Sequence, residues 1–249
     1  MKKAKVQKKA QPPKAFIVFG ATGGIGRAIV KALHDAGHNV IAVARTEHAL
    51  EQLTFKYMRK GRVRYYVGNA LSVSDVEKAF DRTVEFFGTV DGVINATGSW
   101  KMLDFDTSIG DGVALTEQML KMHVLPVQII GRVAREFFLG EKKKGLVVNI
   151  SSHAGFRPEL PGNLAYGPAK AAARFAMMQL DTQLRKKTGI RFCDIAPAIV
   201  NTPEAAEFLD TPRKRRLAVQ PETIASFIVK NIDNPRIPTT KNFRSRIDV

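Results

Sequence analysis

The stretch Phe16-Ile-Val-Phe-Gly-Ala-Thr-Gly-Gly-Ile-Gly26 decides the fold of this chain. It opens with an apolar run typical of a buried strand, continues through a glycine-rich turn, and leads into apolar residues at helical spacing between Ile25 and Leu33. Glycines permit a tight turn and let backbone N–H groups approach a pyrophosphate at the N-terminus of a helix. The stretch therefore predicts a strand, a glycine turn and a helix that together bind a dinucleotide.

Apolar runs of this kind recur along the chain and alternate with helical patterns. They are nearly continuous in hydrophobicity, which is typical of parallel strands that helices cover on both faces. The sequence therefore predicts an α/β fold, a single doubly wound Rossmann-like domain over residues 15–249 with a mostly parallel, seven-stranded sheet. The runs assigned to strands are residues 15–20, 40–44, 63–67, 92–96, 146–150 and 190–195.

The composition favours one enzyme-sized domain. The chain has 249 residues, of which 45% are hydrophobic and 25% charged, so it can bury a substantial core. No run approaches the roughly 18 consecutive apolar residues of a membrane helix, and no apolar segment marks a signal peptide. We therefore expect a cytoplasmic protein without a membrane partner. The one cysteine, Cys193, reads as a buried structural thiol, and no spacing of histidines predicts a metal site.

The net charge of +16 is unusually high. Residues 1–14 are rich in lysine and lack hydrophobic periodicity, so they predict a flexible basic arm. Basic runs at residues 59–64, 142–144 and 213–216 are typical of solvated loops or helix ends. Such charge can attract nucleic acid. No nucleic-acid-binding motif or aromatic platform accompanies it, so we do not expect a nucleic-acid partner.

Tyr166 and Lys170 form a second motif, shortly after the Ser151-Ser152 pair that ends an apolar run. Residues four apart share one face of a helix, so the Lys170 ammonium can lie near the Tyr166 phenol. A tyrosine has a pKa of about 10, and a neighbouring cation favours the phenolate and lowers that pKa. The spacing therefore predicts a tyrosine that exchanges protons near neutral pH.

The ordered motifs together resemble the short-chain dehydrogenases/reductases over residues 15–203. The glycine turn matches that family, except that Phe19 replaces the usual threonine. The segment Asp91-Gly-Val-Ile-Asn-Ala-Thr-Gly98 resembles the family segment that ends in Asn-Asn-Ala-Gly. The segment Ala196-Pro-Ala-Ile-Val-Asn-Thr202 resembles its Pro-Gly-x-x-x-Thr strand end, with alanine in place of the glycine. Several motifs in the family order are a specific signal, whereas one alone is weak.

The resemblance implies catalytic roles for four side chains. Ser152, rather than Ser151, would hydrogen-bond the substrate carbonyl or alcohol, and Tyr166 would exchange the proton. Lys170 would bind the nicotinamide ribose and lower the pKa of the phenol. His123 stands where many relatives have an asparagine that holds a water on the proton path. It serves either in a proton relay or as a packed residue bonded to the backbone.

The resemblance also implies a nicotinamide cofactor. NAD sites usually place an acid after the second strand to bind the ribose 2′-hydroxyl, whereas a 2′-phosphate needs a cation. Here Arg45 stands at that point, and its planar fork suits a phosphate, so the sequence favours NADP(H) over NAD(H). The residues expected to bind the cofactor are Gly20, Thr22, Gly23, Gly24, Ile25, Gly26, Arg45, Asn69, Ala70, Asn95, Ala96, Thr97, Tyr166, Lys170, Pro197, Ile199, Val200 and Thr202.

These features predict a reductase that transfers a hydride from NADPH to a ketone or aldehyde, with Tyr166 as proton donor. The alternative is an NADP(H)-binding scaffold or sensor that has kept the pocket with little turnover, which His123 and the altered motifs leave open. The segment from Ala169 to Leu184 carries more apolar residues than an exposed helix needs, and in relatives this helix pairs across a two-fold axis. We therefore expect a homodimer or homotetramer that acts on a small carbonyl or alcohol substrate.

Overall fold

The protein is built on one seven-stranded sheet in the order β3-β2-β1-β4-β5-β6-β7. Every pair of neighbouring strands is parallel. The structure, a computed structural model, describes residues 12–57, 61–158 and 162–245. Residues 1–11 of the basic arm predicted from the sequence lie outside the described residues. The predicted doubly wound α/β fold is confirmed, with a sheet that is parallel throughout.

Six strands lie where the apolar runs predict them, within two residues at each end. The seventh was not located from the sequence, because its residues Thr-Lys-Asn-Phe are short and mostly polar at the edge of the sheet. The strands are β1 (Ala15–Phe19), β2 (Asn39–Ala44), β3 (Val63–Val67), β4 (Gly92–Asn95), β5 (Leu146–Ile150), β6 (Arg191–Pro197) and β7 (Thr240–Phe243).

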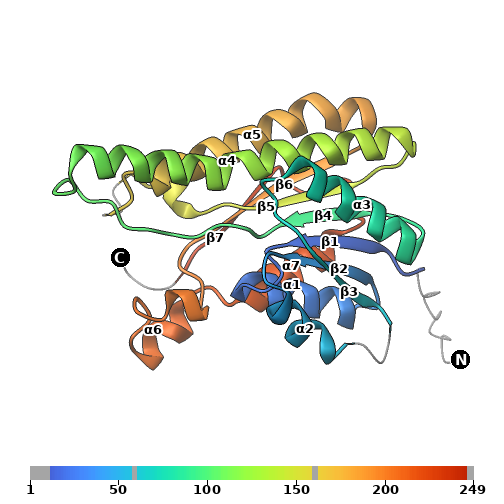
Figure 1. Cartoon of the computed structure of the whole chain (residues 1–249), viewed down its shortest axis with the longest axis horizontal. Coiled ribbons are helices and arrows are strands. Elements are labelled where there is room, and N and C mark those ends of the chain that lie inside the picture. The colour runs from blue at the N-terminus through green and yellow to red at the C-terminus, as the bar shows by residue number, and fades with distance from the viewer. Residues whose placement is uncertain (1–11, 58–60, 159–161, 246–249) are drawn as a thin grey trace, which may run out of the picture.

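Helices cover both faces of the sheet (Figure 1). One layer holds α1 (Gly24–Asp35), α2 (Glu47–Phe55) and α7 (Pro221–Asn231), and the other holds α3 (Val73–Phe87), α4 (Ile109–Gly140) and α5 (Tyr166–Thr188). Successive residues of β1 face opposite layers. Phe16 and Val18 join the core under α1, whereas Ile17 and Phe19 join the core under α4. Burial on both faces explains why the strands are continuously apolar.

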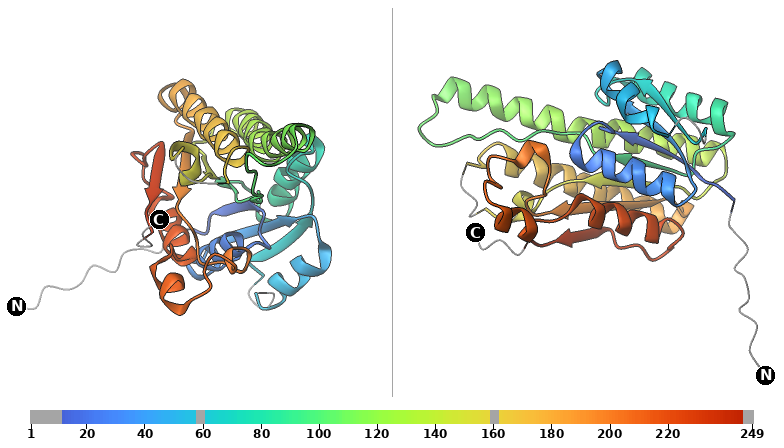
Figure 2. Two further views of the ribbon diagram at one scale, coloured as in Figure 1. Left: turned by 90° about the vertical axis from the view of Figure 1, so that its left-hand side faces the viewer. Right: turned by 90° about the horizontal axis from the view of Figure 1, so that it is seen from below.

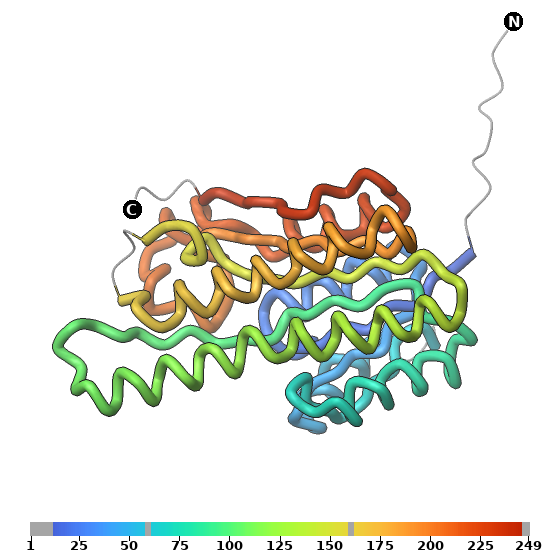
Figure 3. Tube along the Cα trace, turned by 90° about the horizontal axis from the view of Figure 1, so that it is seen from above, coloured from blue at the N-terminus to red at the C-terminus, as the bar shows by residue number. Residues whose placement is uncertain are grey.

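Helices α4 and α5 lie side by side along one face, and the first turns of α4 project beyond the sheet (Figures 2 and 3). Part of this surface is apolar and exposed: Phe175 on α5 is 60% exposed, and Met178 and Leu125 are also exposed. These side chains are available for contact with another molecule. Among the residues that the structure describes, no helix combines the length and apolar character that crossing a membrane requires.

Parallel strands bring the loops after β1, β4, β5 and β6 to one edge of the sheet, which we call the carboxyl edge. The strand order reverses between β1 and β4, and a ligand crevice forms at such a point in α/β sheets. Gly20 shows how closely the loops approach, because its φ is +73° and an added Cβ would lie 2.5 Å from the Ala96 carbonyl oxygen. The 3-10 turns η2 (His153–Phe156) and η3 (Pro203–Ala205) and the short helix α6 (Pro212–Leu217) belong to the same loops.

Candidate active site

The glycine turn connects β1 to α1 and brings the N-terminus of that helix to the carboxyl edge. The Ala21 N–H bonds the Val43 carbonyl at 3.2 Å, which ties the turn to the end of β2. On the other side, a Cβ added at Gly24 would lie 2.6 Å from the Thr202 side chain. The turn, the loop after β4 and the loop after β6 are therefore in direct contact. Of the predicted cofactor residues, this brings together the glycine turn (20–26), Ala96, Thr97 and Thr202.

Other predicted cofactor residues lie in the loops around this centre, and the Val200 carbonyl accepts from the Thr202 N–H at 2.9 Å. Arg45 follows the end of β2, is exposed, and makes no hydrogen bond or ion pair with another residue that the structure describes. Asn69 forms a local turn, in which its side-chain oxygen accepts from the Leu71 N–H at 3.0 Å. Ala70 beside it is buried. Three further members, Pro197, Ile199 and Val200, lie at and just after the end of β6, where Ile199 and Val200 pair with Val219.

The two serines after β5 have different surroundings. Ser151 is buried and donates to the Asp194 carboxylate at 2.5 Å. Ser152 begins η2, where its oxygen accepts from the Ala154 N–H at 3.2 Å, and its side chain forms a hydrogen bond with the Tyr166 phenol. The structure thus brings Ser152 and Tyr166 together. Ser151 instead belongs to a structural contact beneath them.

Ser151 is one end of a buried polar chain that crosses three strands. Asn95, Asn149 and Asp194 are neighbours in the sheet register. Asn95 donates to Asn149 at 2.9 Å, and Asn149 donates to Asp194 at 2.8 Å. Asn95 also accepts from the Thr97 hydroxyl at 2.6 Å. The predicted cofactor residues Asn95 and Thr97 therefore hold the loop after β4 in place, a role that the motif alone did not reveal.

The pKa of Tyr166 is raised, not lowered. Burial of the phenol raises its pKa to about 12, and the hydrogen bond with Ser152 opposes that increase. The sequence predicted that Lys170 would lower this pKa, and that prediction is wrong for the chain alone. The Lys170 ammonium lies 5.5 Å from the centre of the Tyr166 ring. At that place the loss of solvation is the largest influence on the pKa of the phenol.

Lys170 is a buried cation with little to balance it. It is 5% exposed, and its ammonium donates to the Ile150 carbonyl at 3.1 Å. It makes no direct ion pair with a carboxylate of the described residues, although the Asp194 charge acts on it. Burial lowers its pKa to about 8, and Asp194 opposes that decrease. The helical spacing placed Tyr166 and Lys170 on one face, as predicted, but the neighbours of that face set their protonation.

His123 lies against the same tyrosine. The two rings meet edge to face with centroids 5.2 Å apart. The His123 Nε2 lies 2.9 Å from the Ser99 carbonyl, which can only accept, so Nε2 carries the hydrogen and Nδ1 is a bare acceptor. Nδ1 is buried and has no hydrogen-bond partner among the described residues. Burial, and then repulsion from Lys170, lower the His123 pKa to about 3, so the ring is neutral.

Gly98 makes room for His123 and Lys170. Its φ is +138°, and an added Cβ would lie 2.9 Å from His123 Nδ1 and 3.5 Å from the Lys170 nitrogen. Both side chains therefore face the same small space beside the loop after β4. A side chain at this position would displace one of them.

Three loops meet at Trp100. Its indole N–H donates to the Asn163 side chain at 3.0 Å, and its ring meets Phe208 edge to face at 5.0 Å. In the structure it connects the segments around residues 100, 163 and 208.

Glu204 is a site residue that sequence reasoning missed. Its carboxylate accepts from the Gly24 N–H at 3.3 Å, so it lies at the N-terminus of α1 although 180 residues separate the two in sequence. No local motif could reveal this contact, because it depends on how the loop after β6 folds back over the glycine turn. The only available signal was an acid two residues after the strand-end Thr202.

A nucleotide fits the residues at the carboxyl edge. The first turn of α1 has no acid of its own and no side-chain cap, so its N–H groups need an anion or acceptor from elsewhere. The Glu204 carboxylate already lies there as such an anion. The exposed Arg45 at the end of β2 could receive a further negative group. In the part of the chain that the structure describes, no three His, Cys, Asp or Glu side chains are grouped to hold a metal ion.

Several known proteins are similar to this chain. A family model described as short chain dehydrogenase matches residues 14–213. Ipsdienol dehydrogenase of Ips pini is 32% identical over 198 residues, which cover 76% of this chain and 75% of that protein. An uncharacterized oxidoreductase of Staphylococcus epidermidis is 28% identical over 226 residues, which cover 89% and 92%. The solved structure of ElxO with NADP bound has a TM-score of 0.78 at 18% identity, covers 94% and 97%, and shows the likeness of fold.

Proposed function

The chain belongs to the short-chain dehydrogenase/reductase family, and from that premise we propose that it uses NADPH to reduce a ketone or aldehyde to an alcohol. The observation that carries the proposal is the hydrogen-bonded pair of hydroxyls, Ser152 and Tyr166, beside a helix N-terminus that accepts an anion. The name of ipsdienol dehydrogenase describes redox chemistry on an alcohol, which supports the same substrate class.

Ser152 and Tyr166 would bind the carbonyl oxygen of the substrate with their two hydroxyls. NADPH, when bound, supplies the hydride that the carbonyl carbon accepts. Tyr166 donates its proton to the same oxygen as negative charge develops there. The raised pKa of about 12 keeps the phenol protonated at neutral pH, so the donor is ready in this direction of the reaction.

Lys170 stabilises the phenolate that remains, because its ammonium lies 5.5 Å from the tyrosine ring in a buried setting. By its resemblance to the family, Lys170 would also bind the ribose of the cofactor. We propose that His123 helps to return a proton to Tyr166 after the reaction. A ring with a pKa of about 3 does not store a proton, so its contribution is to accept a hydrogen bond at Nδ1, the atom that lacks a partner among the described residues.

The exposed Arg45 supports a preference for NADPH over NADH. A guanidinium binds a phosphate with charge-assisted hydrogen bonds worth about 1.5–3 kcal/mol. We expect Arg45→Ser to weaken NADPH binding at least about tenfold and to leave NADH binding within about twofold. Arg64→Ser is the matched control. Arg64, on β3, is also exposed, but its guanidinium lies against the Phe86 ring of α3. Equal losses for both cofactors would contradict the preference.

We also propose that the protein is a homodimer through the apolar surface of α4 and α5. Phe175 and Met178 are exposed on α5, next to the long helix α4. Burying such side chains between two copies removes them from water, which favours association. Light scattering that finds only monomer at micromolar concentration would contradict this.

The proposed reaction is tested by following NADPH absorbance with a panel of ketones and aldehydes. Tyr166→Phe should lower turnover of any substrate found by about 10²–10⁴-fold, because it removes the proton donor. NADPH binding should stay within about threefold. Tyr65→Phe is the control, because the Tyr65 hydroxyl lies on β3 near Glu51, far from the proposed chemistry in sequence and sheet order. Tight NADPH binding without turnover in the unmodified protein would favour the scaffold or sensor instead.

A further inference from the structure

The N-terminus of α1 is capped by a residue from another part of the chain. Its N-cap residue, Gly23, has no side chain to accept a hydrogen bond, and no acid stands in the first turn. The first N–H groups of a helix need partners, and its dipole favours a negative charge there. Glu204 of η3 meets both needs, with Oε1 3.3 Å from the Gly24 nitrogen.

The contact brings the whole start of η3 against the glycine turn. A Cβ added at Gly24 would lie 3.1 Å from Glu204 Oε2 and 2.6 Å from the Thr202 side chain. The carboxylate therefore lies directly over the first turn of the helix. Glu204 itself is exposed, so its side chain can rotate into solvent without disturbing the core.

A carboxylate and a phosphate compete for this position. Both are anions that bind free N–H groups at a helix N-terminus, and two like charges at one set of donors repel each other. We propose that Glu204 is a latch on the nucleotide site: its carboxylate occupies the α1 N-terminus in the chain alone and leaves when a nucleotide diphosphate binds. This inference rests on the proposed function, because it assumes that a dinucleotide binds at the glycine turn.

The latch sets the affinity for the diphosphate part of the ligand only. Displacing Glu204 removes a favourable contact between a charge and the helix dipole, worth about 1 kcal/mol, which corresponds to about fivefold in affinity. A ligand without phosphate has no reason to displace the carboxylate. The charge of Glu204 should therefore distinguish ADP from adenosine.

Isothermal titration of the full chain with ADP, adenosine and NADP⁺ tests the proposal. Glu204→Gln keeps the shape of the side chain and removes its charge, so we expect ADP and NADP⁺ to bind about fivefold more tightly and adenosine to change by less than twofold. Glu207→Gln is the matched control, since Glu207 is also exposed, lies three residues away and forms no hydrogen bond or ion pair with the described residues of α1. It should leave all three affinities within twofold.

Two results would overturn the latch. In one, Glu204→Gln binds ADP no more tightly than the unmodified protein. In the other, Glu207→Gln tightens ADP binding equally, so that only net charge matters. If Glu204→Gln binds ADP and the unmodified protein does not, the latch is supported in its strongest form. If neither the variants nor the unmodified protein bound NADP⁺ or ADP, the proposed function would fail together with the latch. That outcome is distinguishable from the two results above, in which the nucleotide still binds.

Discussion

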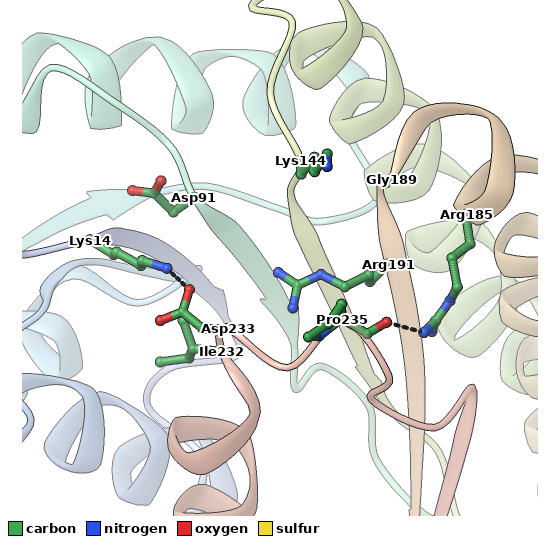
Figure 4. Close-up of a pocket in the computed structure, with 9 residues that line it drawn as sticks. All are labelled: Lys14, Asp91, Lys144, Arg185, Gly189, Arg191, Ile232, Asp233 and Pro235. Carbon is green, nitrogen blue, oxygen red and sulfur yellow. Dashed lines mark hydrogen bonds and ion pairs between the residues drawn. The ribbon is translucent and has the colours of Figure 1, made fainter. Parts of the chain in front are cut away.

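The two edges of the sheet differ in how their charged side chains are paired and buried. The strands begin at the edge opposite the carboxyl edge, which we call the amino edge. There a cavity of about 350 Å³ is lined mostly by charged side chains (Figure 4). Lys14 forms an ion pair with Asp233, and Asp91 accepts from the Ala15 N–H at 2.9 Å. Arg185 donates to the Ile237 carbonyl at 2.8 Å, and Arg191 donates to the Asn234 carbonyl at 3.0 Å. These contacts join the starts of the strands to the loops after α5 and α7.

At the carboxyl edge the polar groups are left less satisfied. Lys170 donates to the Ile150 backbone carbonyl but forms no ion pair with a carboxylate in the described chain. His123 Nδ1 has no hydrogen-bond partner among the described residues. The pKa values of Tyr166, Lys170 and His123 all shift toward the neutral form because of burial. Polar groups buried without full partners cost stability, and they are typical of sites that do chemistry. The difference is that three neighbouring side chains at the carboxyl edge have large pKa shifts from burial, whereas the cavity lies at the other edge.

The comparison is tested most strongly by Lys170→Met, which should lower activity more than a hundredfold and raise stability at the same time. Burial lowers the Lys170 pKa from 10.5 to about 8, which corresponds to about 3 kcal/mol of cost at neutral pH. Loss of the hydrogen bond to Ile150 offsets about 1 kcal/mol of the gain. Urea unfolding at pH 7 should therefore show a variant more stable by about 2 kcal/mol.

The same variant has a defined pH dependence. Between pH 8 and 10.5 the unfolded chain binds a proton at Lys170 that the folded chain does not, so the stability of the unmodified protein rises with pH in that window. The advantage of Lys170→Met should shrink as the pH is raised from 7 to 10. A variant that is less stable than the unmodified protein at pH 7 would contradict our account of the carboxyl edge.

The amino edge should show the reverse pattern with Arg185→Met. The Arg185 guanidinium pairs with the buried Asp181 at 2.7 Å, and its removal leaves that carboxylate without its cation. We expect a loss of about 3 kcal/mol in the free energy of unfolding. Turnover measured well below the melting temperature should stay within about twofold. The neighbouring exposed Lys186→Met should change stability by less than about 0.5 kcal/mol. A tenfold loss of turnover in folded Arg185→Met would mean that the two edges are coupled.

The last prediction concerns the stability of the protein at acid pH. The folded pKa of His123 is about 3, below its ordinary value of 6.5, so the unfolded chain takes up a proton first as the pH falls. The stability that depends on the neutral ring is fully present above pH 6.5, and about 2 kcal/mol of it is lost by pH 5. His123→Asn should remove this loss in urea unfolding at pH 7 and pH 5. His48→Asn, at an exposed position, should leave the loss in place.

The elements of the fold could be predicted where the pattern was strong. Most residues of these strands are apolar, so β1 to β6 were located within two residues. β7 was not located from the sequence, because an edge strand of four mostly polar residues has no such pattern. The chemical motif was equally local: Tyr166 and Lys170 share a helix face because they are four residues apart.

Electrostatics at the site could not be predicted in the same way. The sequence placed a cation near a phenol and predicted a lowered pKa, but it did not show that Lys170 is buried or that loss of solvation raises the pKa of the partly buried Tyr166. It also did not show that His123 donates to Ser99 and leaves Nδ1 bare. Glu204 was invisible for the same reason, since its partner Gly24 lies 180 residues earlier.

The sequence by itself determined the α/β fold, the glycine turn and the helix face that carries Tyr166 and Lys170, because hydrophobic pattern and residue spacing act over short stretches of chain. Only the tertiary structure decided the protonation of these groups and the anion that covers the α1 N-terminus. The physical reason is that desolvation and hydrogen-bond partners come from segments distant in sequence, and burial outweighs a single neighbouring charge when water is excluded.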